Sequence, residues 1–287
     1  MASALHKTRL LMENVKFEHS IFALPFAYLG MILAAKGLPS LSQFVWITVA
    51  MVGARTFAMS VNRLADRPED ARNPRTARRP LPLGLLRPWE VTLSAVVALA
   101  VTAFAAWQLN PLALMLLPLA ALILAGYAFT KRFTWLCHFI LGLADGGAPF
   151  GGWIAVTGTL SWEPLLLCLA VAFWVGGFDL IYACQDVEFD RANGLHSVPA
   201  RFGIAASLTQ ARVWHTLTVF LLAGVGVMDG LRWPYWLGLA GAVGLLAYEH
   251  SLISPRDLSK LNMAFFNVNG YLAVLVFAAA ALGVFVA

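Results

Sequence analysis

Long apolar segments constrain this chain more than any other feature of its sequence. Of its 287 residues, 60% are hydrophobic and 12% are charged, whereas roughly 25% of the residues in a soluble domain are charged. A transmembrane helix needs about 20 consecutive apolar residues, so the apolar content suffices for eight or nine spans. The sequence therefore predicts a membrane protein and excludes a secreted disulfide scaffold, a disordered chain and a soluble enzyme.

Charged and turn-forming residues divide the apolar sequence into nine segments. We predict an all-α, polytopic membrane protein, a single domain over residues 1–287. About nine transmembrane helices are expected, at residues 20–38, 43–64, 89–108, 111–130, 136–157, 163–185, 210–229, 233–252 and 264–286. Turns are expected at residues 109–111 and 158–159, where asparagine, proline and glycine interrupt the apolar pattern.

Basic residues gather on one side of the predicted membrane. With nine spans, 17 of the 20 Lys and Arg residues fall on the side that holds the N-terminus. Lys36 and Arg232 fall on the other side, and Arg55 lies inside the second span. Cytoplasmic loops are rich in Lys and Arg, so we expect the N-terminus inside a bacterial inner membrane and the C-terminus outside. The net charge of +5 then reflects topology and implies no nucleic-acid partner.

The acidic residues show the same asymmetry, which topology does not require. At the end of the second span, Asn62, Asp66 and Asp70 recur every four residues and share one face while the segment is helical. Like charges at this spacing repel unless a cation lies between them. Pro68 predicts that the last turn is irregular. A basic, proline-bounded loop follows directly, at residues 73–82.

A second cluster ends the sixth span about 120 residues later. Asp179, Tyr182, Asp186 and Asp190 are spaced by three, four and four residues, which predicts a single helical face. Asp179 is expected inside or at the edge of the hydrocarbon, where a carboxylate is costly and usually functional. A polar loop containing arginine follows this cluster too.

Two helical faces that carry metal-binding oxygen atoms, each followed by arginines, suit a metal ion bound together with a diphosphate. Mg²⁺ binds a few carboxylates together with water and substrate phosphates, whereas carboxylates alone would repel a diphosphate. For a membrane protein, the substrate with a diphosphate head and an apolar tail is a polyprenyl diphosphate. The pattern predicts Mg²⁺ bound at Asp66, Asp70, Asp186 and Asp190, with Asn62 as a neutral ligand.

These residues resemble the signature motifs of the UbiA family of intramembrane prenyltransferases. The first motif, Asn-x3-Asp-x3-Asp with Arg-Thr-x2-Arg-Pro-Leu, is met at residues 62–81, and the second, Asp-x2-Tyr-Ala-x2-Asp-x3-Asp, at residues 179–190. A weaker feature is Tyr127-x3-Lys131-Arg132. The resemblance implies nine transmembrane helices around a central cavity, with Asp-rich cytoplasmic caps. It further implies transfer of a polyprenyl group to an aromatic acceptor in quinone biosynthesis, with the lipid bilayer as surroundings and no obligatory protein partner.

Further residues receive candidate roles from their charge, their depth and this resemblance. We expect catalytic roles, in stabilising pyrophosphate or near the allylic carbon, for Lys131, Arg132, Asp179 and Tyr182. Substrate-binding roles are expected for Arg55, Arg75, Arg78, Arg79, Tyr127 and Asp145. For Asp179 and Tyr182, a hydrogen bond that only locks two helices is an equal alternative, and for Arg55 a buried structural ion pair is a rival.

The identity of the acceptor is left open. Many family members carry Asp directly after the motif asparagine, where this chain has Arg63. In this form the sequence resembles bacterial 4-hydroxybenzoate polyprenyltransferases, which favours that acceptor. A futalosine-derived or naphthoate acceptor of menaquinone synthesis is the alternative. A secondary transporter is less favoured because its charges would lie near the midplane, and a CDP-alcohol phosphotransferase is disfavoured because its Asp-Gly-x2-Ala-Arg motif is absent from the sequence.

Overall fold

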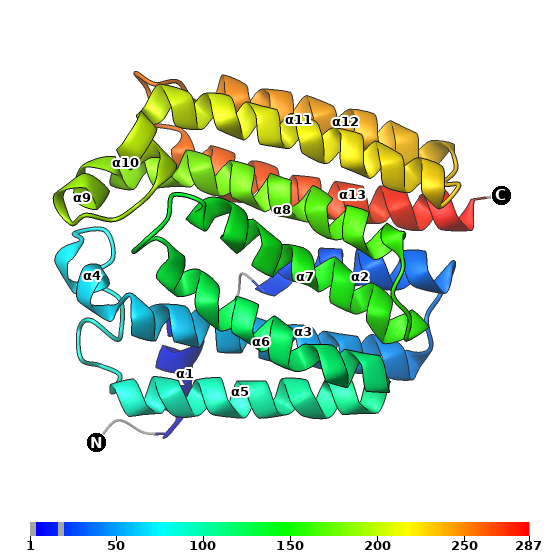
Figure 1. The fold of residues 1–287 in the computed structure, drawn as a ribbon, viewed down its shortest axis with the longest axis horizontal. Coiled ribbons are helices and arrows are strands. Elements are labelled where there is room, and N and C mark those ends of the chain that lie inside the picture. The colour runs from blue at the N-terminus through cyan, green and yellow to red at the C-terminus, as the bar shows by residue number, and fades with distance from the viewer. Residues whose placement is uncertain (1–3, 17–19, 287) are drawn as a thin grey trace.

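Long helices lying side by side make up most of the protein (Figure 1). The computed structural model describes residues 4–16 and 20–286. The elements are α1 (Ala4–Asn14), α2 (Ser20–Ala35), α3 (Leu41–Ala65), α4 (Arg67–Arg72), α5 (Pro88–Leu109), α6 (Pro111–Thr130), α7 (Cys137–Thr157), α8 (Trp162–Ala183), the 3-10 turn η2 (Cys184–Asp186), α9 (Val187–Ala192), α10 (Val198–Phe202), α11 (Ile204–Met228), α12 (Trp233–Ser251), the π-helix η3 (Met263–Val268) and α13 (Asn269–Phe285). Within the described ranges the only β pairing is an isolated bridge between Ser254 and Asp257. The all-α fold class is confirmed.

Each of the nine predicted spans coincides with a helix, within a few residues at most ends. Among the described residues, seven helices are long and apolar enough to cross a membrane: α3, α5, α6, α7, α8 continued to Ala192, α11, and η3 with α13. The apolar part of α2 that qualifies, Leu24–Ala35, is shorter. The seventh predicted span begins too late, because α11 starts at Ile204. The protein is therefore an integral membrane protein, and the count of nine spans stays a prediction.

Local sequence signals explain where several helices begin and end. Ser40 caps α3, because its side chain accepts from the backbone N–H of Gln43 (3.2 Å) and the Gln43 side chain accepts from the Ser40 N–H (3.0 Å). Asn110 caps α6, because its side chain accepts from the backbone N–H of Ala113 (2.9 Å), and Pro111 occupies the first helical position. Gly158 ends α7 with φ of 64°, a left-handed conformation that suits glycine. The turns predicted at 109–111 and 158–159 are thus confirmed.

The short elements gather at one end of the bundle, which we call the cap end (residues 66–87, 131–136 and 184–203). Figure 1 shows α4, α9 and α10 together there, while the C-terminus lies at the opposite end. α1 packs onto the cap end, where its Leu10 joins a buried cluster with Leu81, Leu86 and Val91. The first and second acidic motifs therefore lie at the same end of the molecule.

A close contact between α7 and α8 holds the backbones of the two helices next to each other. A Cβ atom at Gly142 would collide with the backbone carbonyl of Ala172, whereas at Gly147 of the same helix nothing lies within 4 Å. We expect Gly142→Ala to destabilise the protein by about 1–3 kcal/mol, because the two backbones would have to separate. Thermal unfolding of the purified protein in detergent measures this. Gly147→Ala is the matched control, and equal stabilities of the two variants would contradict the packing argument.

Candidate active site

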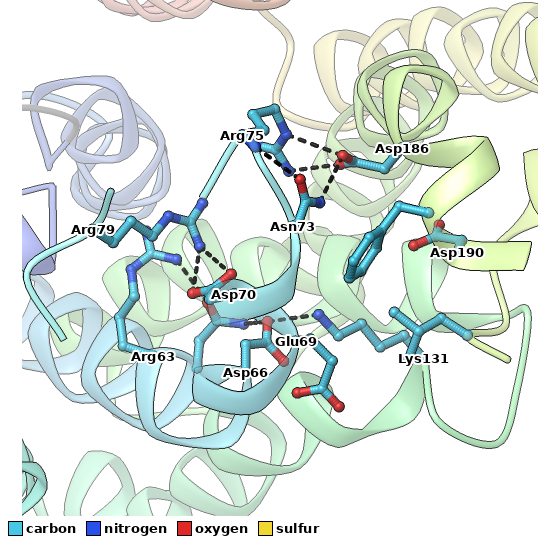
Figure 2. A pocket seen from close by; sticks show the side chains of 13 residues that line it. Arg63, Asp66, Glu69, Asp70, Asn73, Arg75, Arg79, Lys131, Asp186 and Asp190 are labelled. Atoms are coloured by element: carbon cyan, nitrogen blue, oxygen red, sulfur yellow. Dashed lines mark hydrogen bonds and ion pairs between the residues drawn. The ribbon is translucent and has the colours of Figure 1, made fainter. Parts of the chain in front are cut away.

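A polar pocket of about 140 Å³ lies at the cap end, between the end of α3 and the segment that follows α8 (Figure 2). All but two of the side chains that line it carry a charge or an amide: Asn62, Arg63, Asp66, Glu69, Asp70, Asn73, Arg75, Arg79, Lys131, Asp186, Phe189, Asp190 and Leu195. They come from three separate parts of the chain. The pocket therefore brings the two acidic clusters together in one site.

The first cluster keeps its helical spacing through a break in the helix. The helix is interrupted at Asp66, between α3 and α4, and Pro68 lies in the first turn of α4. This is the irregular turn that Pro68 predicts. The Asp66 N–H donates to the Asn62 carbonyl (2.9 Å), and the Asp70 N–H donates to the Asp66 carbonyl (2.7 Å). Because these helix-like bonds connect residues four apart, all three side chains share a face, and all three line the pocket.

The second cluster is divided between the pocket and the interior. α8 ends before the 3-10 turn η2, and α9 follows directly. A 3-10 turn has three residues per turn, so it changes the angle between the residues of α8 and those that follow. Asp186 and Asp190 line the pocket, while Asp179 and Tyr182 lie deeper, on α8, and do not line it. The prediction of one face for all four residues stays a prediction: Arg75 contacts both Tyr182 and Asp186, whereas Asp179 contacts His138.

Each aspartate of the pocket accepts a hydrogen bond, and Figure 2 shows the contacts of Asp66, Asp70 and Asp186 with cations. Arg79 Nη1 contacts both carboxylate oxygens of Asp70 at 2.7–2.8 Å, and Lys131 Nζ contacts Asp66 Oδ2 at 2.6 Å. Arg75 binds Asp186 through two nitrogens, at 2.6 and 3.1 Å. Asp190 accepts from the Ser197 hydroxyl at 2.7 Å. The basic residues predicted to bind a diphosphate thus contact the acids predicted to bind a metal.

Arg75 connects the two halves of the pocket. Burial lowers the pKa of its guanidinium, but the hydrogen bond and the negative charge of Asp186 outweigh this, so its pKa lies above the ordinary value and it stays charged. Its Nη1 also donates to the Tyr182 hydroxyl (3.2 Å). Asn73 makes a parallel connection, because its Nδ2 donates to Asp186 Oδ1 (3.1 Å). The loop after α4 is therefore tied to the end of α8.

Two other basic residues of the prediction differ in position. Arg132 does not line the pocket, but its Nη2 contacts two acids that do, Glu69 Oε2 (3.0 Å) and Asp66 Oδ1 (3.3 Å). Arg78 is exposed and lies outside the pocket lining. The structure therefore places Arg132 where it supports the first cluster and does not bring Arg78 to the site.

Two of the deeper candidates, Asp179 and Tyr182, have side-chain partners that the sequence did not reveal. Asp179 Oδ2 lies 2.7 Å from His138 Nδ1, which belongs to α7. The Tyr182 ring stacks on Phe265 of the π-helix η3, with centroids 4.1 Å apart. Both partners come from helices remote in sequence. They lie between the pocket and the interior of the bundle.

Arg55, Tyr127 and Asp145 form an intramembrane group that does not line the pocket, although Tyr127 is also within electrostatic range of Asp66. Asp145 lies within electrostatic range of Arg55 and Asp179, and Tyr127 within range of Asp145 and Arg55. The Nε atom of Arg55 is buried without a hydrogen-bond partner in the structure, and Arg55 forms no ion pair with a described residue. The structure therefore does not show the structural ion pair that was the alternative role for Arg55.

Sequence reasoning gave no site role to several residues that belong to the site. Arg63, noted only as a departure from the motif, lines the pocket while its Nε donates to the Asn14 carbonyl of the N-terminal segment (2.9 Å). Asn73 and Glu69 also line it. Their position next to the acidic motif was a usable signal. For His138 there was none, because its relation to Asp179 arises only from the packing of α7 on α8.

The oxygen atoms that line the pocket fit a hard divalent cation. Its polar groups are carboxylates, amides, guanidinium groups and one ammonium group, and no His or Cys is among its lining residues. Among the described residues no three acidic, His or Cys side chains are close enough to hold an ion together. Mg²⁺ commonly uses one or two carboxylates and completes its coordination with water and substrate phosphates, so this arrangement suits Mg²⁺ that arrives with a diphosphate.

Comparison with known sequences extends over nearly the whole chain. The profile of the UbiA prenyltransferase family matches residues 23–271. The chain is 35% identical to the 4-hydroxybenzoate octaprenyltransferase of Cupriavidus necator over 255 residues, which cover 88% of each chain. It is 34% identical to the enzyme of the same name from Vibrio cholerae over 261 residues, 89% of each chain.

Solved structures show the same fold. A UbiA homologue from Aeropyrum pernix K1, solved in its apo form, superposes with a TM-score of 0.84 at 32% identity and covers 92% of this chain and 97% of its own. A UbiA homologue from Archaeoglobus fulgidus, bound to DMAPP and Mg²⁺, gives a TM-score of 0.73 at 20% identity and covers 96% of this chain and 99% of its own. The chain belongs to the UbiA prenyltransferase family, whose members are enzymes that transfer prenyl groups.

Proposed function

We propose that this prenyltransferase moves a polyprenyl group from a polyprenyl diphosphate to 4-hydroxybenzoate in a Mg²⁺-dependent reaction of ubiquinone synthesis. One observation carries the proposal. Two carboxylate clusters from distant parts of the chain meet across a pocket whose aspartates are held by Arg75, Arg79 and Lys131. The names of the relatives support the acceptor, and the distribution of Lys and Arg supports a site on the cytoplasmic face of a bacterial inner membrane.

The basic residues bind the diphosphate by changing partners. Asp66, Asp70, Asp186 and Asp190, with Asn62, would supply the protein ligands of Mg²⁺, one or two carboxylates to an ion, and bound Mg²⁺ would draw negative charge from the diphosphate and ease departure of pyrophosphate. Release of the aspartates from Arg75, Arg79 and Lys131 frees these cations for phosphate oxygens. As the allylic C–O bond breaks, the same cations stabilise the charge on the leaving group.

The acceptor is bound deeper in the bundle. The unpartnered Nε of Arg55 provides a charged donor for the carboxylate of 4-hydroxybenzoate. Tyr127 and Asp145 lie near it, and the apolar walls of the bundle exclude water from the allylic cation. Asp179 and Tyr182, which lie deeper on α8 than Asp186, would contact the reacting carbons.

The test is direct. Purified protein in detergent is incubated with Mg²⁺, a polyprenyl diphosphate and a panel of aromatic acids that includes 4-hydroxybenzoate and naphthoates, and both prenylated product and free pyrophosphate are measured. We expect prenylated 4-hydroxybenzoate as the main product. A naphthoate product with no reaction of 4-hydroxybenzoate would assign the alternative acceptor. No product with any acid and no pyrophosphate release would overturn the proposal.

Arg55 gives a separate prediction about the acceptor. Loss of a hydrogen bond to a charged group costs about 1.5–3 kcal/mol, so Arg55→Met should raise the KM for 4-hydroxybenzoate by about 10- to 100-fold. The KM for the polyprenyl diphosphate should change little, because Arg55 lies outside the diphosphate pocket. Steady-state kinetics with each substrate varied measures both. Equal changes in the two KM values would contradict the role of Arg55 in binding the acceptor.

A further inference from the structure

His138 and Asp179 form a pair that takes no part in the proposed binding of the metal or the diphosphate. His138 Nδ1 lies 2.7 Å from Asp179 Oδ2, and the two side chains are 4% and 23% exposed. The histidine is thus enclosed, whereas part of the aspartate remains open. The pair uses one oxygen of the carboxylate and leaves room for a second group to approach Asp179.

The position of the proton on His138 follows from its second contact. The backbone N–H of Val198 donates to His138 Nε2 at 3.2 Å. A backbone amide can only donate, so Nε2 must present its lone pair, and the proton of the neutral imidazole is on Nδ1. Nδ1 therefore donates to Asp179, which accepts as a carboxylate. Protonation of Nε2 would break the bond to Val198.

The Val198 amide is itself firmly held at the cap end. Its neighbour Ser197 donates to Asp190 through the hydroxyl (2.7 Å), and the backbone N–H of His196 donates to the Lys131 carbonyl (2.6 Å). Three consecutive residues thus contact the second acidic cluster, His138 and the chain at Lys131. His138 is fixed on one side by this segment and on the other by Asp179.

Prenylation of an aromatic ring requires a base, and Asp179 combines a neutral partner with a deep position on α8. Asp66, Asp70 and Asp186 are paired with Lys or Arg, and a carboxylate held by a cation is a weaker base. Asp179 has a neutral partner. It also lies on α8 deeper than Asp186, toward the region of Arg55 and Asp145.

We propose that Asp179 accepts the ring proton of the acceptor and that His138 is the positioning residue that aims its carboxylate. This inference rests on the proposed function. The allylic C–O bond breaks, and its electron pair leaves with pyrophosphate. The C–C bond forms between the allylic carbon and the ring carbon beside the one that carries the hydroxyl group. The ring C–H bond then breaks, its proton moves to the free oxygen of Asp179, and its electron pair restores the aromatic ring.

The test compares 4-hydroxybenzoate with the same acid deuterated beside the hydroxyl group. In the wild type, both acids should react at the same rate, because C–O cleavage limits the reaction. Asp179→Asn should lower kcat by about 10²-fold or more, within the range of general base catalysis, and should give a primary isotope effect on kcat. His138→Leu should lower kcat by about tenfold, also with an isotope effect and with little change in either KM.

Two further variants separate positioning from folding. His138→Asn keeps an N–H near the place of Nδ1, so it should recover most of the activity and lose the isotope effect. Asp145→Asn should show no isotope effect, whatever its rate. Equal rates with both acids in His138→Leu and Asp179→Asn would overturn this inference alone, as would an isotope effect in Asp145→Asn. Absence of product and pyrophosphate from the wild type would overturn the proposed function, and this inference with it.

Discussion

Asp66→Asn and Asp186→Asn should each lower kcat by about 10²- to 10³-fold or more, the range seen when one electrostatic contact to a developing charge is removed. Asp66 and Asp186 lie on opposite sides of the pocket, and each change replaces a charged metal ligand by a neutral one. The variants should still insert and fold, because the change alters charge and not shape. Product formation under saturating Mg²⁺ and polyprenyl diphosphate measures the effect, and size-exclusion chromatography of the detergent-purified variants checks folding.

Glu188 provides a matched control for these variants. It lies between Asp186 and Asp190 in sequence, but it is exposed and does not line the pocket. Glu188→Gln removes the same charge from the same short segment and should leave activity near the wild-type level. Near-normal activity in both aspartate variants would refute the assignment of the metal ligands, and a large loss in Glu188→Gln would show that net charge at the cap end matters more than position.

Removal of Mg²⁺ with a chelator should abolish turnover, and the binding of Mg²⁺ should depend strongly on diphosphate. In the structure the cations of Lys131, Arg79 and Arg75 contact three of the four aspartates. A metal ion alone must displace them, whereas a metal ion with diphosphate gives the displaced cations new partners. We expect pyrophosphate to strengthen Mg²⁺ binding by about 5- to 150-fold, a typical coupling between two ligands. Calorimetric titration with and without pyrophosphate, corrected for their association in solution, measures this.

Lys131→Met makes the coupling argument specific. Without the ammonium group, Asp66 is freed on the side of Lys131, so Mg²⁺ alone should bind more tightly than in the wild type. Pyrophosphate should bind less tightly, because one cation of the pocket is lost. A wild-type Mg²⁺ affinity that is the same with and without pyrophosphate would contradict the exchange of partners.

Much of the site was already predictable from local sequence. The spacing of Asn62, Asp66 and Asp70 predicted one face, and it holds because backbone hydrogen bonds at four-residue intervals continue across the break at Asp66. The same reasoning described the second cluster less completely. There a 3-10 turn after α8 separates Asp179 and Tyr182 from Asp186, and Asp179 contacts His138 deeper than the pocket. Nothing in the spacing of the aspartates predicts that turn.

The sequence by itself determined the membrane class, the helical fold, the pairing of two acidic clusters and the resemblance to the family. These follow from composition and from spacing along a helix, which are local properties. The tertiary structure alone decided which cation binds which aspartate, that Arg78 is exposed, that Arg55 lacks a partner for its Nε, and that His138 meets Asp179. Such contacts join residues from different helices, 41 residues apart for His138 and Asp179 and 111 for Arg75 and Asp186. They depend on how closely helices such as α7 and α8 approach and at what rotation, which no local pattern encodes.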